Sequence, residues 1–168
     1  MIQIFKMKNY FQKRTIPTFC ILFFLTISHI SVSQNSSFKL PDSLKNKSYE
    51  EYASLFYKNQ NDSIIAYKYA NLYLIKAKKE KDTIRIARGF SLLASLSFSS
   101  DLLSTIINCD SIIKYTENLE HFEYPAYGYL LKGISNFQIG NYDYSLNNYL
   151  TAQKYALKNK NIEQLFFY

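Results

Sequence analysis

The sequence predicts an all-α protein in which helices follow one another in repeated pairs. Residues that favour tight turns are scarce, with 4 Gly and 3 Pro in a chain of 168 residues. Apolar and small residues recur at three- and four-residue spacing through the body of the chain, which is the period of one helix face. Few tight turns and long periodic segments argue against a fold of many short strands.

Helical spacing marks six segments of the body and the start of a seventh. The spacing is clear in the series Ile65, Tyr69, Leu72 and Ile75. Asp62 stands just before this series, where its carboxylate can accept hydrogen bonds from the free N–H groups of a first turn. The expected helices cover residues 48–59, 62–80, 83–98, 101–119, 124–138 and 143–158, and another begins near residue 162.

The polar breaks between these helices are evenly spaced. Asp62 and Asp101 are about 39 residues apart, as are Asp82 and His121, which is within the range of known helical repeats. Asn161 follows His121 after nearly the same interval. A fixed period of two helices indicates that each pair buries its apolar face against the next pair, as in a solenoid. The spacing therefore predicts about three stacked helix pairs over residues 48–160.

Residues 126–157 carry small and aromatic residues in a recognisable order. A glycine lies in the first helix, a Gly-Asn-Tyr-Asp turn follows, and a small, an aromatic and a small residue come three, seven and ten residues after the tyrosine of the turn. This order resembles the tetratricopeptide repeat, although the period here exceeds the family's repeat of about 34 residues and Asn136 stands where an aromatic is usual. The resemblance implies packing roles for Ala94, Gly133, Gly140, Tyr142, Ser145, Tyr149 and Ala152.

The earlier pairs match this family less closely. Ala94 precedes Gly133 by the same interval that separates the polar breaks, and Phe98 precedes Phe137 by that interval too. The middle pair thus keeps two positions of its first helix. Its second helix departs from the pattern, and the first pair is recognised mainly by spacing.

The resemblance implies a peptide-binding groove, because the first helices of such pairs line a concave face. The side chains placed there are Arg88, Ser91, Ser95, Phe98, Ser99, Tyr127, Leu130, Ile134, Phe137 and Gln138. Arg88 and Gln138 are the strongest candidates, since polar groups on an otherwise apolar stripe need partners. The alternative is that apolar members such as Ile134 belong to the core.

Residues 1–34 have the features of a secretory signal peptide. A basic start leads into the apolar run 19–25, and Ser31-Val32-Ser33 offers small residues before Gln34. The run is shorter than the roughly 20 residues of a membrane span. An uncleaved anchor remains an alternative. The sequence thus predicts an exported protein, periplasmic or membrane-associated, with a polar linker over residues 35–47.

Charge gives no support for nucleic-acid binding by this segment. The formal charge is +7, but four basic residues lie in the leader, which leaves 16 basic and 13 acidic residues, or about +3. The densest basic run, residues 76–81, is interleaved with Glu80 and followed by Asp82, as expected of a solvated helix end. Phosphate recognition needs a more concentrated basic face.

The sequence also gives no support for catalysis. It contains none of the usual nucleophile, phosphate-loop or metal-ligand motifs. Beyond the leader, one cysteine and one histidine remain, Cys109 and His121. We expect Cys109 to be buried and inert, and His121 to be a surface or capping residue. The protein is therefore expected not to be an enzyme and to need no cofactor or metal.

A looser resemblance concerns the order of leader, Pro41-Asp42-Ser43-Leu44 and repeats rich in Tyr and Lys. This order is similar to the N-terminal region of membrane-bound bacterial regulators that end in an AraC-type helix-turn-helix domain. The resemblance implies the sensory or interaction region of a larger signalling protein with a protein or peptide partner, in contact with a membrane only through its leader or later parts. In that interpretation residues 161–168 start a further, truncated repeat. A free-standing exported scaffold of an envelope complex is the alternative.

Overall fold

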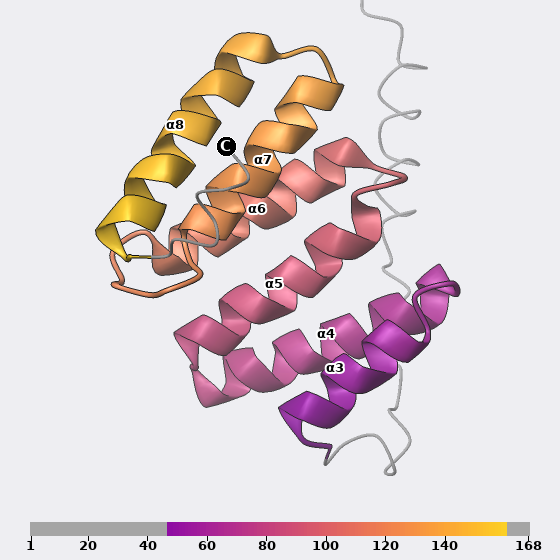
Figure 1. Ribbon diagram of the computed structural model, residues 1–168. Helices are drawn as coiled ribbons and strands as arrows, with labels where there is room; N and C mark the ends of the chain where they lie inside the picture. Colours follow the sequence, from indigo (N-terminus) through magenta and orange to yellow (C-terminus); the bar gives the residue numbers. More distant parts are fainter. Residues whose placement is uncertain (1–46, 161–168) are drawn as a thin grey trace, which may run out of the picture. The chain divides into compact units, whose positions relative to one another are not determined.

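A computed structural model describes residues 47–160 of the chain. Within that range it contains six α-helices and no strand, which confirms the predicted all-α class for the described residues (Figure 1). The predicted leader, the linker before residue 47 and the helix expected near 162 lie outside them. The helices are α3 (Tyr49–Lys58), α4 (Ser63–Glu80), α5 (Thr83–Ser97), α6 (Leu102–Thr116), α7 (Ala126–Gln138) and α8 (Tyr142–Lys158).

Side-chain caps fix several helix starts close to where the sequence places them. Asp62 accepts hydrogen bonds from the backbone N–H groups of Ile64 and Ile65, and Asp82 and Asp101 cap α5 and α6 in the same way. The largest difference from the expected bounds is at the end of α6, which was expected at residue 119 and is observed at Thr116.

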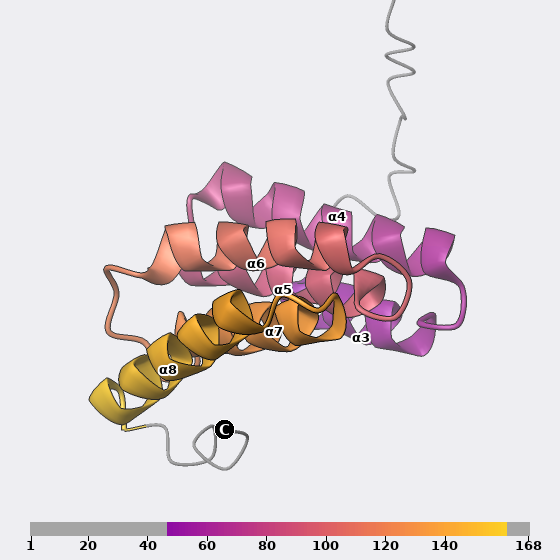
Figure 2. The same ribbon diagram turned by 90° about the horizontal axis from the view of Figure 1, so that it is seen from above.

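Each helix packs mainly against the helix before it and the helix after it in the chain. Successive helices run in alternating directions (Figure 1). The helix α5 therefore lies against both α4 and α6, and Figure 2 shows α4 and α6 on the same side of it.

The core between α5, α6 and α7 consists of two small clusters. Ala87, Ile112 and Tyr124 form one, and Ala94, Cys109 and Leu131 form the other. Tyr127 is partly buried and packs against both clusters. Cys109 is buried, as expected, and this burial raises the pKa of its thiol to about 12, with a further contribution from the nearby Asp110 carboxylate.

Buried positions recur along alternate helices. In α4 the alanines at 66, 70 and 77 are fully buried, and so are the residues of α6 that follow them by the interval between the polar breaks, at 105, 109 and 116. In α8 the residues that follow Thr105 and Thr116 by nearly the same interval are Ser145 and Ala156, which are also buried. The helices α4, α6 and α8 therefore pack against their neighbours through faces of small side chains.

The face that α4 buries is not the one that its largest apolar residues suggest. In the series that indicated this helix, Leu72 is buried, but Ile65 and Ile75 are exposed. The alanine face packs inward instead, because small side chains let helices approach closely. Gly89 of α5 extends this close contact, since a Cβ there would lie 2.9 Å from Leu74 Cβ.

None of the helices between residues 47 and 160 is both long enough and apolar enough to cross a membrane.

Candidate binding surfaces

The predicted groove residue Arg88 is engaged within the chain. Its Nη2 donates a hydrogen bond of 2.8 Å to the Tyr57 hydroxyl of α3, and its Nη1 lies 3.7 Å from Oε1 of Glu123, just before α7. Nearby, the Tyr124 hydroxyl donates to Ser91 Oγ at 3.4 Å. Burial raises the pKa of the Tyr124 phenol, so the hydroxyl stays protonated. Arg88 thus links α3, α5 and the segment before α7.

The other predicted groove residues are divided between core and surface. Ser91 and Leu130 are buried, while Phe98, Tyr127 and Ile134 are half-buried. Phe98 packs against the cluster around Cys109. The remaining positions, Ser95, Ser99, Phe137 and Gln138, are exposed.

Three predicted groove residues do meet at one place. Phe98, Ser99 and Gln138 line a hollow of about 630 Å³ at the ends of α5 and α7, which also includes Leu103 and Ile139. The structure therefore brings these three together, and it separates them from Arg88, which does not line this hollow.

The residues that the family resemblance assigns to helix packing lie mostly between α7 and α8. A Cβ at Gly133 would lie 2.8 Å from the Tyr149 ring, and Ser145 Oγ donates to the Gly133 carbonyl oxygen at 2.9 Å. Ala94 and Ala152 are fully buried. Beyond α7 the chain turns at Gly140, whose φ of 84° favours glycine, and Tyr142 is exposed with its ring edge-on to Phe137.

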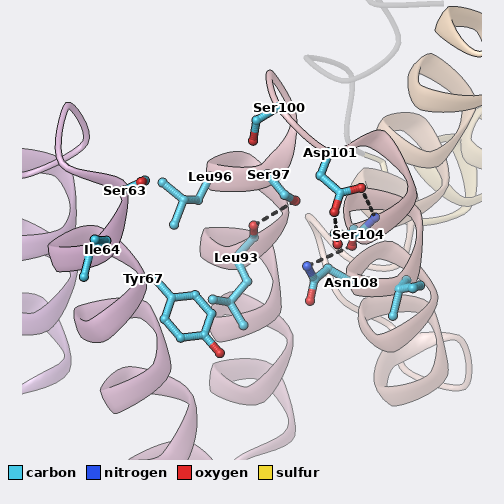
Figure 3. A pocket seen from close by; sticks show the side chains of 11 residues that line it. Ser63, Ile64, Tyr67, Leu93, Leu96, Ser97, Ser100, Asp101, Ser104 and Asn108 are labelled. Carbon is cyan, nitrogen blue, oxygen red and sulfur yellow. Dashed lines mark hydrogen bonds between the residues drawn. The ribbon is translucent and has the colours of Figure 1, made fainter.

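A second surface, which the sequence did not indicate, lies between α4 and α6 over the end of α5. We call it the α4–α6 cleft (Figure 3); its volume is about 610 Å³. Its lining residues are Ser63, Ile64, Tyr67, Leu93, Leu96, Ser97, Ser100, Asp101, Ser104, Ile107 and Asn108.

Large apolar side chains stand exposed on both walls of this cleft. Ile64 and Tyr67 of α4 are 81% and 54% exposed, and Ile107 of α6 is 65% exposed. Figure 3 shows Tyr67 and Leu93 directed into the space between the walls. Contiguous exposed apolar groups are typical of surfaces that other molecules cover.

The polar part of the cleft is neutral or acidic. Asp101 is the one charged side chain among the lining residues. Hydrogen bonds from the Ser104 hydroxyl and backbone N–H hold the pKa of Asp101 below its usual range, so this carboxylate is ionised at neutral pH. At the back of the cleft, Ser97 Oγ and Thr105 Oγ1 share a hydrogen bond of 2.8 Å.

Part of the predicted groove faces away from the cleft across α5, although the hollow that Phe98, Ser99 and Gln138 line shares Ser100 and Asp101 with the cleft. Leu93 and Ser97 of the cleft each differ by two positions from Ser95 of the groove, which is roughly 200° around an α-helix. The sequence signal that could have revealed the cleft is in α4, which carries Ile64 and Tyr67 as well as the alanine face. A helix that is apolar on more than one side has more than one face to cover.

No group of three or more His, Cys, Asp or Glu side chains within residues 47–160 is arranged to hold a metal ion. His121 Nδ1 accepts hydrogen bonds of 3.2 Å from the backbone N–H groups of Glu123 and Tyr124, so this histidine caps the turn before α7, in line with the capping role expected of it.

Comparisons with protein family models, curated proteins and solved structures find no match for the chain.

Proposed function

We propose that this protein binds a protein or peptide partner and does not catalyse a reaction. The observation that carries the proposal is the α4–α6 cleft, where Ile64, Tyr67 and Ile107 expose apolar surface on two facing walls. A cleft of this volume is in the usual range for ligand sites, but its open apolar walls suit a macromolecular surface.

We propose that the helices act as a repeating array of tetratricopeptide-like pairs. Two observations support such an array: each helix packs mainly on its chain neighbours, and equivalent positions of α4, α6 and α8 are buried at a nearly constant interval along the chain. Stacked pairs form extended surfaces along which partners bind.

The setting of this binding is the extracytoplasmic side of a membrane, as the sensory or interaction region of a larger signalling protein. Support for export comes from the basic and apolar leader over residues 1–34. Support for the signalling role comes from the order of leader, Pro41-containing linker and repeats.

A photo-crosslinking amino acid placed at single positions of the full chain, in its native host, tests the function and its surface together. The positions are Ile107 in the cleft, Ser95 on the other side of α5, and Lys79, which is exposed near the far end of α4. We expect a discrete crosslinked protein from Ile107 and none from Lys79. A product from Ser95 alone would move the site to the predicted groove. Absence of a product at all three positions would overturn the proposal.

A further inference from the structure

The geometry of the α4–α6 cleft points to the class of its partner: an amphipathic helix with a basic side chain near Asp101. This inference rests on the proposed function, because it concerns the same cleft, and it adds the conformation and charge of what binds there.

The walls of the cleft favour a helical occupant. Ile64 and Tyr67 lie three residues apart on α4, so they form a ridge along one turn of that helix. Ile107 belongs to α6, which flanks the cleft on the other side. Figure 3 shows Leu93 of α5 between Tyr67 of α4 and Asn108 of α6. A row of apolar side chains at three- and four-residue spacing fits between two such helices, since ridges of one helix pack into grooves of others.

The charge of the cleft selects against acidic partners. Its single charged lining residue, Asp101, stays ionised, and no Lys or Arg lines the cleft. A phosphate, a nucleic acid or an anionic lipid headgroup would meet a carboxylate here and no cation. A lysine or arginine of the partner would instead make a charge-assisted hydrogen bond to Asp101.

The carboxylate can be neutralised without removing the helix cap that it provides. Asparagine caps helices as well as aspartate does, so Asp101→Asn removes the charge and keeps an acceptor for the Ser104 N–H. In the apolar part, Ile107→Ser removes an exposed contact from the cleft. Ile75→Ser is its matched control, since Ile75 is 54% exposed on α4 and does not line the cleft.

The test is a selection from a phage-displayed library of amphipathic helices whose apolar and flanking polar positions are randomised, with the full chain as target. We expect the selected helices to carry large apolar residues at i, i+3 or i+4, and i+7, together with Lys or Arg beside that stripe. Fluorescence anisotropy should then show binding weakened about tenfold by Ile107→Ser, about fivefold by Asp101→Asn, and unchanged by Ile75→Ser. The Asp101→Asn effect should shrink with added salt.

Four results would contradict the inference about the partner. Enrichment of acidic flanks, enrichment of sequences without helical spacing, no enrichment at all, or equal binding to the wild-type and Ile107→Ser chains would each overturn the inference. If crosslinking from Ile107 captures a protein while the library gives one of these results, the proposed function stands and only the class of partner is wrong. If crosslinking also captures nothing, both proposals fail.

Discussion

The two sides of α5 differ in whether their side chains find partners within the chain. On one side Arg88 reaches Tyr57 of α3 and Glu123 ahead of α7, so its guanidinium has partners within the chain. On the other side, Leu93 and Leu96 line a cleft whose walls expose Ile64 and Ile107 to solvent. The first side stabilises the stack of helices, and the second leaves apolar surface that a partner can cover.

This difference shows why residue type alone is a poor guide to a binding site in a helical array. A polar residue on an apolar stripe needs a partner, and the arginine finds that partner in the neighbouring helices of its own chain. Exposed apolar side chains that line one cleft, such as Ile64, Tyr67 and Ile107, are in contrast typical of surfaces that other molecules cover.

The largest expected effect is a loss of stability when a buried side chain of α5 is truncated. Leu92 of α5 is 1% exposed, and Leu92→Ala should lower the free energy of unfolding by about 2–5 kcal/mol, because a cavity replaces buried contacts. Urea denaturation followed by circular dichroism measures this change. Ile107→Ala on the exposed wall should change the same quantity by less than about 0.5 kcal/mol. Equal losses in the two variants would mean that Ile107 is covered in the folded chain.

The next effect concerns the contact that sets α4 against α5. A Cβ at Gly89 would lie 3.0 Å from the Leu74 Cα, which is backbone and cannot rotate away. Gly89→Val should therefore cost about 1–3 kcal/mol of unfolding free energy through overpacking. Ser95→Ala, at an exposed position of the same helix, is the control and should be nearly neutral. A neutral Gly89→Val variant would refute the close approach of α4 and α5.

A smaller effect is expected at the guanidinium that links α3, α5 and the segment before α7. Arg88→Met keeps much of the aliphatic stem and removes the hydrogen bond to Tyr57 and the ion pair with Glu123, for a loss of about 1 kcal/mol. Lys158→Met removes an exposed pair with Glu120, with 3.6 Å between Lys158 Nζ and Glu120 Oε1, and should have no measurable effect. Chemical denaturation of both variants compares them. If Arg88→Met is as silent as the control, Arg88 does not hold the helices together.

The smallest expected effect is a pH dependence of stability that arises from Asp101 in the α4–α6 cleft. The pKa of Asp101 is lowered in the folded chain, chiefly by the Ser104 hydroxyl. The ionised carboxylate therefore stabilises the fold at pH values above its ordinary pKa of 3.8. This stabilisation is lost as the pH falls through the lowered pKa. Asp101→Asn lacks this titration. The difference in melting temperature between wild type and Asp101→Asn should therefore shrink below about pH 4. A difference that is constant from neutral to strongly acidic pH would show that the carboxylate is not held in its ionised form.

The sequence predicted the bounds of the helices well, but it did not predict which face of α4 is buried or that α4 and α6 flank a cleft, for physical reasons. Helix starts follow from local chemistry, since an aspartate such as Asp82 caps the turn directly after it. The inward face of α4 depends on how closely its neighbours approach, and that depends on Gly89 in another helix. The partner of Arg88 likewise lies 31 residues away, at Tyr57. Local periodicity carries no information on either contact. It therefore could not distinguish the side of α5 where Arg88 pairs within the chain from the side that lines the cleft.

The most direct test of this account is the affinity of a partner captured by crosslinking, measured for chains altered on one side of α5 or the other. We predict that Ile107→Ser weakens binding about tenfold, whereas Arg88→Met changes it by less than about twofold. Circular dichroism melting curves establish that both chains are folded at the temperature of the assay. The reverse order, with Arg88→Met as the damaging change, would contradict the assignment of binding to the α4–α6 cleft.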